Sequence, residues 1–340
     1  MFSPFGFALA ISSLAASAAT TEDWPVSAPS MEGLNPDTLA RLDAHVQTEL
    51  PHLRSLLIAR HGRMVFEKYY GDARREELQN MQSMTKSVSS ALVGIALREG
   101  LITSLDHRVL DYFAEYQDEI GDPRMRDVTI RHLLTMASGL DETRLSFDKG
   151  LADPIAGILR QKLLYAPGQG FRYSSAAAHL LGGVLRKAVG RPVLEFAQTE
   201  LFRPLGMGRV DWYADKTGLQ SGGMSGLWRS RDMLKLGELY LRHGTWNHVE
   251  VVPSVYVAES VKPQNRGNFY GEQAVYGYGW WITNVAGRDA FYARGYGGQY
   301  LMVIPRADLV VLCTSDWKQP EYPDHFSLVA EFILPSISKT

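Results

Sequence analysis

Strand-forming sequence lies toward both ends of this chain, and helix-forming sequence fills most of its middle. Two strand-like runs, 53–59 and 63–70, flank His61-Gly62, which is a hairpin signal. Four more strand-like segments lie beyond residue 271: 276–283, 290–293, 300–304 and 309–314. We therefore expect an α/β (α+β) fold, in which both chain ends build one antiparallel sheet flanked by helices.

The middle of the chain is expected to form an inserted, all-helical lobe. Apolar residues recur there at helical spacing, and strand signals are scarce. The predicted boundaries are an α/β lobe of residues 32–104 and 218–340, and a helical lobe of residues 105–217. A chain of 340 residues is long enough for such an arrangement.

The first 19 residues resemble a secretory signal peptide. An Ala-rich apolar run ends in Ala16-Ser17-Ala18, and polar residues follow from Thr20. The run lacks a Lys or Arg, so a surface-lying or disordered tail is the alternative. It is also too short and too interrupted by Ser for a membrane span of ~20 apolar residues. We expect an exported protein, periplasmic or secreted, without a stable membrane anchor.

Several classes of function find no support in the sequence. A net charge of −2 without a basic block argues against a nucleic-acid partner. Cys313 is the only cysteine and lies in an apolar run, which indicates a buried thiol. His132 and His179 lack a second ligand at metal spacing. No P-loop, G-x-G-x-x-G, H-E-x-x-H or G-x-S-x-G motif is present, so neither a metal nor another cofactor is predicted.

The stretch 81–97 is typical of a helix that carries a nucleophile. Its apolar residues recur at 3.6-residue spacing: Met84, Val88, Ala91, Leu92 and Ile95. Ser83 precedes this run, and Lys86 is three residues further on, so their side chains would lie on one helix face. The hydroxyl would then have an amine nearby and free helix N–H groups beneath it, which favour a developing negative charge.

The alternative for Ser83 is an ordinary helix N-cap, because Ser-x-x-Lys is a weak pattern. The chain contains four such pairs: Ser83/Lys86, Ser146/Lys149, Ser315/Lys318 and Ser336/Lys339. Only the first opens an amphipathic helix. Two other stretches are candidates for a site: 166–177, where Tyr173 lies at a loop-to-helix junction, and the Gly-rich 291–300. Their plainer interpretations are a packing tyrosine and a hairpin turn.

Taken together and in order, these stretches resemble a known family. The matching blocks are Ser83-x-x-Lys86, Pro167-Gly168-x-x-Phe171-x-Tyr173-Ser174 and the Gly-rich stretch before Val303-Ile304-Pro305. The chain is similar, over roughly residues 35–335, to serine hydrolases with the class C β-lactamase fold. That group includes DD-peptidases, esterases and nylon-oligomer amidases.

The resemblance implies that Ser83 forms the acyl-enzyme and that Lys86 and Tyr173 serve as base and acid. It also implies an oxyanion hole made by the backbone N–H groups of Ser83 and Tyr296. Lys and Tyr side chains have ordinary pKa values of about 10.4 and 10, so either needs a shift to act near neutrality. The sequence leaves open which of the two is the base.

Two departures from the family pattern affect the substrate. The family's Tyr-x-Asn is Tyr173-Ser174-Ser175 here, and its Lys/His-Thr-Gly aligns with Ala293-Arg294-Gly295. Five residues are candidates for substrate binding: Ser175, Arg294, Gly295, Gly297 and Gln299. Proximity to the motifs adds Trp228 and Met224.

The sequence thus favours a hydrolase of small-molecule carboxylic esters or amides. A β-lactamase or DD-peptidase, and a non-catalytic binding protein of the same fold, are the alternatives.

Overall fold

The computed structural model describes residues 24–141, 151–269, 272–319 and 325–338. The predicted signal peptide and the Ser146/Lys149 pair lie outside the described residues. Within the described part, no helix has the length and apolar character needed to cross a bilayer.

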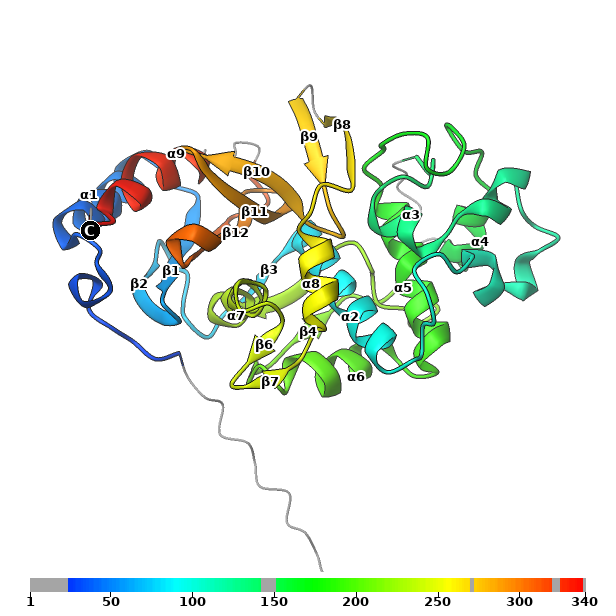
Figure 1. Cartoon of the computed structure of the whole chain (residues 1–340), viewed down its shortest axis with the longest axis horizontal. Coiled ribbons are helices and arrows are strands. Elements are labelled where there is room, and N and C mark those ends of the chain that lie inside the picture. Colours follow the sequence, from blue (N-terminus) through cyan, green and yellow to red (C-terminus); the bar gives the residue numbers. More distant parts are fainter. Residues whose placement is uncertain (1–23, 142–150, 270–271, 320–324, 339–340) are drawn as a thin grey trace, which may run out of the picture.

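An eight-stranded antiparallel sheet forms the core, in the order β2-β1-β13-β12-β11-β10-β9-β8 (Figure 1). Its strands are β1 (Leu53–Arg60), β2 (Arg63–Tyr69), β8 (Asn265–Phe269), β9 (Glu272–Tyr276), β10 (Trp281–Val285), β11 (Arg288–Gly295), β12 (Gln299–Ile304) and β13 (Leu309–Ser315). The N-terminal strand β1 pairs directly with the C-terminal β13, with Leu56 opposite Cys313. The predicted sheet from both chain ends is confirmed.

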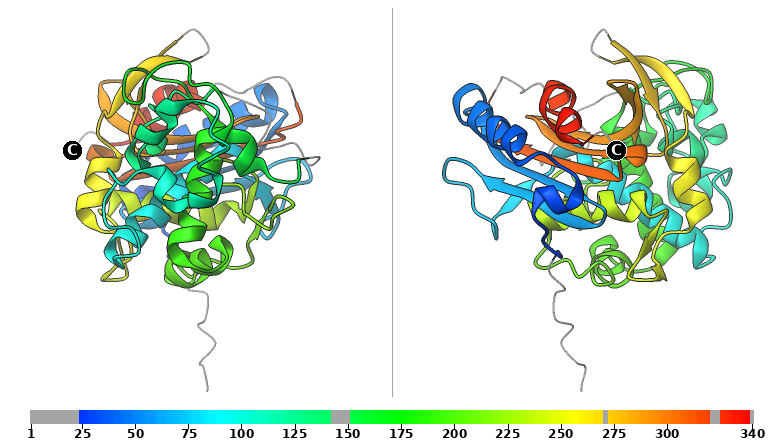
Figure 2. Two further views of the ribbon diagram at one scale, coloured as in Figure 1. Left: turned by 90° about the vertical axis from the view of Figure 1, so that its right-hand side faces the viewer. Right: turned by 60° about the vertical axis from the view of Figure 1, so that its left-hand side comes forward.

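Helices cover both faces of this sheet. On β1, Leu56 and Ile58 pack in the cluster that holds α1 (Pro36–Glu49) and the helical C-terminal segment from α9 (His325–Ser327) to Ser336. Leu57 and Ala59 point to the opposite face, toward α7 (Ser230–Leu241). This alternation follows from the two-residue period of a strand. Figure 2 shows α1 and α9 on one side of the sheet and α7 on the other.

The described elements between residues 105 and 217 are helical, apart from the short strand β4 (Asp211–Trp212). They include α3 (Ile130–Leu134), α4 (Pro154–Leu159), α5 (Ser175–Val189), α6 (Val193–Ala197) and a π-helical turn (Gln198–Phe202). α2 (Thr85–Arg98) packs against α5 and so joins this region to the sheet. The predicted boundaries of the two lobes stay a prediction.

Several elements were missed by the sequence analysis. A second sheet contains β3 (Leu78–Asn80), β5 (Gly226–Arg229) and β4 (Asp211–Trp212), and β3 leads directly into the Ser83 turn. Further short elements are β6 (Thr245–Trp246), β7 (Val249–Glu250) and α8 (Ser254–Ser260). Strands of two to four residues are too short to show a periodic pattern.

The predicted strand 276–283 was wrong in one respect, because it is broken between β9 and β10. Gly279 has a φ of +77°, and a Cβ added there would lie 2.8 Å from the carbonyl oxygen of Lys86. The Ser87 hydroxyl donates a hydrogen bond of 2.6 Å to the Gly279 carbonyl. The break therefore lets this turn approach α2 closely, which a continuous strand would prevent.

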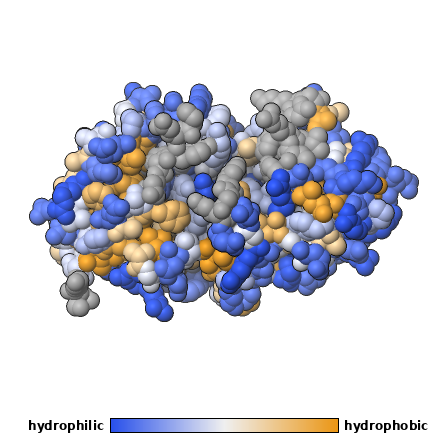
Figure 3. Space-filling model, turned by 90° about the horizontal axis from the view of Figure 1, so that it is seen from above, coloured by the Kyte–Doolittle hydropathy of each residue, from blue (hydrophilic) through white to orange (hydrophobic). Residues whose placement is uncertain are grey.

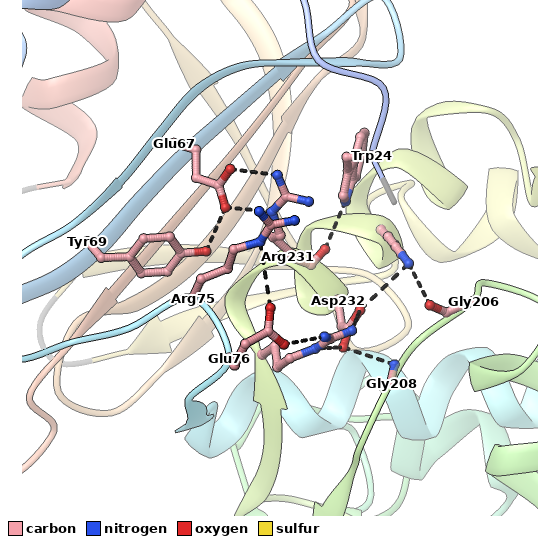
Figure 4. Close-up of polar contacts among 11 residues, drawn as sticks. Trp24, Glu67, Tyr69, Arg75, Glu76, Gly206, Gly208, Arg231 and Asp232 are labelled. Atoms are coloured by element: carbon pink, nitrogen blue, oxygen red, sulfur yellow. Dashed lines mark hydrogen bonds and ion pairs between the residues drawn. The ribbon is translucent and has the colours of Figure 1, made fainter. Parts of the chain in front are cut away.

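A network of charged side chains fixes the start of α7 (Figure 4). The Arg231 guanidinium donates to both carboxylate oxygens of Glu67 on β2, at 2.5 and 2.7 Å. The Arg229 guanidinium donates hydrogen bonds to the carboxylates of Asp232, at 2.7 Å, and Glu76, at 2.6 Å. The buried charges of Arg231 and Asp232 require such partners. The contacts tie α7 to the main sheet and, through the exposed Glu76, to the segment before β3.

Candidate active site

Ser83 lies in a tight turn between β3 and α2. The preceding residue, Gln82, has a φ of +49°, in the left-handed region that non-glycine residues seldom adopt. Its N–H bonds the Asn80 side chain at 3.0 Å, and its carbonyl accepts from the Thr85 hydroxyl at 2.6 Å. Such strain of about 1–3 kcal/mol persists only where surrounding contacts impose it. The result is a partly exposed Ser83 in a 3-10 turn that leads into α2.

Lys86 lies beneath Ser83 on the first turn of α2 and is only 4% exposed. Its Nζ donates to the Ser83 Oγ at 3.1 Å, to the Ser175 Oγ at 3.2 Å and to the Gly223 carbonyl at 2.8 Å. A buried ammonium group requires hydrogen-bond acceptors, and these oxygens provide them.

Tyr173 approaches the same amine from the N-terminus of α5. The centre of its ring lies 4.7 Å from the Lys86 Nζ, within the range of a cation–π contact. Trp281 stacks on the Tyr173 ring at 5.2 Å, and Phe269 lies 4.9 Å away. The structure therefore brings Tyr173 next to Lys86 and its neighbour Ser83, from which it is far removed in the chain.

The C-terminal end of β11 lies against the Ser83 turn. A Cβ added to Gly295 would lie 2.4 Å from the Met81 carbonyl oxygen, so this position tolerates only glycine at the observed separation. Tyr296 follows directly, and its side chain is 56% exposed. Gly297 turns the chain with a φ of +76°, packed on the backbone of Trp317. The backbone of the β11–β12 turn is thus adjacent to the turn that carries Ser83.

The remaining predicted residues take different positions. Arg294 is partly exposed, with its guanidinium carbon 5.6 Å from the centre of the Phe269 ring and 5.7 Å from that of Tyr300. Met224 is partly exposed and follows Gly223 in the chain. Figure 3 shows the face that carries the β8–β9 hairpin, where hydrophobic side chains form separate patches among hydrophilic ones.

Two of the candidate residues are interior. Gln299 is fully buried, and its amide donates to the carbonyls of Gly297 at 2.8 Å and Ser315 at 2.9 Å. It stabilises the β11–β12 turn and has no exposed surface for a ligand. Trp228 is also fully buried and packs against Phe202 and Trp212.

The main feature that sequence reasoning missed is the backbone carbonyl of Gly223. The Gly222-Gly223 pair is its sequence signal, because a Cβ at Gly222 would lie 2.1 Å from the Ala178 carbonyl oxygen.

Burial raises the pKa of the Cys313 thiol to about 12, which disfavours a thiolate nucleophile. Among the described residues, no group of three or more His, Cys, Asp or Glu side chains is placed to hold a metal ion.

Comparison with known proteins gives consistent matches. A family model described as Beta-lactamase matches residues 54–332. Esterase EstB from Burkholderia gladioli is 30% identical over 196 residues, which are 49% of this chain and 50% of that protein. The 6-aminohexanoate-dimer hydrolase of Paenarthrobacter ureafaciens is 23% identical over 329 residues, 84% of this chain and 80% of the relative.

A solved family VIII carboxylesterase shares the fold, with a TM-score of 0.73 at 18% identity, over 92% of this chain and 98% of the other. The family model spans most of the eight-stranded sheet and all the described helices from α2 to α8. This chain is therefore a hydrolase of the beta-lactamase family.

Proposed function

We propose that this protein hydrolyses a carboxylic ester or amide through an acyl-enzyme formed on Ser83. The observation that carries the proposal is the Lys86 amine, which lies 3.1 Å from the Ser83 hydroxyl and 4.7 Å from the centre of the Tyr173 ring. A serine hydroxyl is a weak nucleophile unless a neighbouring base takes its proton. Here the Lys86 amine lies beside both the serine and a second candidate base, Tyr173.

The contacts of Lys86 support a division of roles. Three oxygens surround the Lys86 amine, and one of them, the Gly223 carbonyl, can only accept; this environment favours the ammonium form, which cannot accept the Ser83 proton. A neighbouring positive charge favours the phenolate form of tyrosine. We therefore assign the base to Tyr173, which takes the Ser83 proton during acylation and returns it to the leaving group. Lys86 supplies the charge that sustains it.

The oxyanion hole is assigned to the N–H groups of Ser83 and Tyr296. Ser83 lies at the N-terminal end of α2, where backbone N–H groups are not used within the helix. The close packing of Gly295 on Met81 places the Tyr296 backbone beside this turn. Two such donors would stabilise the negative charge of a tetrahedral intermediate, and loss of one typically costs about 100- to 1,000-fold in kcat.

Ester or amide hydrolysis is favoured over β-lactam hydrolysis. Penicillin-recognising members carry Lys or His followed by Thr and Gly where this chain has Ala293-Arg294-Gly295. EstB and the 6-aminohexanoate-dimer hydrolase, an esterase and an amide hydrolase by name, are among its relatives.

The test compares wild type with Ser83→Ala on short-chain p-nitrophenyl esters, on a linear amide oligomer and on nitrocefin. We expect wild type to cleave esters or amides, the variant to be inactive, and a fluorophosphonate to label Ser83 alone. Equal ester and amide rates in both proteins would refute the mechanism. Cleavage of nitrocefin alone would identify a β-lactamase, and absence of labelling in folded wild type would identify a non-catalytic binding protein.

A further inference from the structure

A buried histidine–aspartate hydrogen bond lies one helical turn beyond the catalytic region and takes no part in the chemistry assigned above. His179 on α5 and Asp215 bond through Nε2 and Oδ2 at 3.0 Å, and their side chains are only 1% and 6% exposed. The Nδ1 atom of His179 is buried and has no hydrogen-bond partner among the described residues. Burial of a ring nitrogen without a hydrogen-bond partner costs free energy.

Asp215 organises the loop between β4 and β5, residues 213–225. Its Oδ1 accepts hydrogen bonds from the backbone N–H of Thr217 at 2.8 Å, from the Thr217 hydroxyl at 2.6 Å and from the N–H of Leu219 at 3.2 Å. The Asp215 N–H bonds the Leu219 carbonyl in return, at 2.9 Å. The two carboxylate oxygens of Asp215 thus have different partners. Oδ1 bonds to groups within the loop, and Oδ2 bonds the loop to His179 on α5.

The same stripe of α5 runs from the active site to this pair. Ser175, Ala178, His179 and Gly182 are spaced i, i+3, i+4 and i+7, so they share one helix face. Gly222 packs on this face of α5. A Cβ added to Gly222 would lie 2.1 Å from the Ala178 carbonyl oxygen, and a Cβ added to Gly182 would lie 3.3 Å from the Gly222 Cα. The loop therefore packs directly on the α5 backbone.

Two backbone carbonyl groups of this loop accept hydrogen bonds from side chains of α2. The Gly222 carbonyl accepts from the Ser89 hydroxyl at 2.8 Å, and the Gly223 carbonyl accepts from the Lys86 Nζ at 2.8 Å. The latter is the shortest of the three hydrogen bonds that Lys86 makes to Ser83, Ser175 and Gly223. A continuous set of contacts thus leads from His179 through Asp215 and the loop to the active-site amine.

We propose that His179 and Asp215 are positioning residues for Lys86, acting as a latch that holds the 213–225 loop so that the Gly223 carbonyl orients the amine toward Ser83 and Tyr173. The inference rests on the proposed function, because it concerns the reactivity of Ser83. Neither residue contacts the reacting atoms. Misplacement of a catalytic group by about 1 Å from a remote change can lower the rate about 100-fold.

The test uses His179→Leu, Asp215→Ala, their double variant and the conservative His179→Gln, whose amide nitrogen can replace Nε2. His132→Leu is the control, since that imidazole bonds the start of its own helix α3, at the Thr129 N–H. We expect His179→Leu and Asp215→Ala each to lower kcat and the rate of fluorophosphonate labelling about 10- to 100-fold, with KM little changed. Because the two residues act as one unit, the double variant should lose little more than either single variant. His179→Gln should recover most of the rate, and the control should match wild type.

Four results would overturn the latch. These are unchanged rates in His179→Leu, a change confined to KM, the absence of rescue by Gln, and loss of folding in both His179 variants, which would show a purely structural role. The two proposals fail differently. If wild type itself is not labelled at Ser83, the proposed function fails, whereas normal labelling of wild type and of all the variants removes the latch alone.

Discussion

The Oγ of Ser175 lies 3.2 Å from the Nζ of Lys86, at the position where the family motif carries an asparagine. Ser175 is the first residue of α5, while Lys86 lies on α2, so this contact joins the two helices whose N-terminal ends adjoin Ser83 and Tyr173. The departure from Tyr-x-Asn therefore preserves an oxygen acceptor for the buried amine, although it shortens the side chain.

Ser175→Ala should lower kcat/KM for an ester about 10-fold or more, because a hydrogen bond to a charged group contributes about 1.5–3 kcal/mol. Ser175→Asn should retain most of the activity, since its amide oxygen can accept the same bond. Steady-state kinetics of both variants, on protein whose melting temperature is unchanged, check this. Full activity in Ser175→Ala would show that the contact is dispensable.

Gly295→Ala should disrupt the site by steric overlap alone. The added methyl group would lie 2.4 Å from the Met81 carbonyl oxygen, so β11 or the Ser83 turn must move. We expect a loss of about 1–3 kcal/mol in stability together with a large loss of kcat. Gly287→Ala is the matched control: its φ of +79° is also unfavourable for alanine, but nothing lies within 4 Å of the added Cβ. That variant should lose stability and keep its activity, which urea unfolding and ester assays will separate.

The buried Asp215 carboxylate, bonded to His179, predicts a pH dependence of stability. Burial alone would raise the pKa of Asp215, but hydrogen bonds from His179, Thr217 and Leu219 lower it from 3.8 to about 2. The unfolded state therefore binds the proton more readily, so the contribution is complete above about pH 4 and is lost as the pH falls toward 2. It amounts to about 2 kcal/mol. Urea unfolding of wild type and Asp215→Asn at several pH values should show a difference that shrinks on acidification, and a constant difference would contradict it.

Cys313 should resist thiol reagents in the folded protein. Its side chain is 1% exposed, and burial raises its pKa to about 12, so little thiolate forms at pH 8. Iodoacetamide should modify it only after unfolding in urea, and esterase activity should survive the treatment. Rapid modification with loss of activity would show that the strand β13 opens in the native state.

Much of the fold could be predicted from local patterns. Asn35 caps α1 and Pro36 begins it, and α2 ends at Arg98, shortly before Gly100 with its φ of +69°. Both features depend on backbone preferences of a few neighbouring residues.

The β8–β9 hairpin escaped prediction because β8 reads Asn-Arg-Gly-Asn-Phe, with a single apolar side chain. Its attachment comes instead from long-range contacts, such as the Asn265 amide on the Thr135 and Gly170 carbonyls.

The roles of individual residues in the Gly-rich stretch 291–300 could be assigned only from the structure. Gln299 and Gly295 belong to one motif in the sequence, yet Gln299 stabilises the interior of its turn while Gly295 permits β11 to meet Met81. Proximity in a motif does not show which way a side chain points, because that depends on strand register and on the neighbours across the turn.

The sequence by itself determined that Ser83 and Lys86 lie close together on one face of a helical segment, because residues three apart in a helix are neighbours whatever surrounds them. Only the tertiary structure decided that Ser175, Tyr173 and the Gly223 carbonyl would converge on the same amine. Those contacts span between 87 and 137 positions in the chain, since Tyr173 and Gly223 are that far from Lys86. No local preference extends over such a distance. The contacts arise instead from the packing of α5 and of the 213–225 loop on α2.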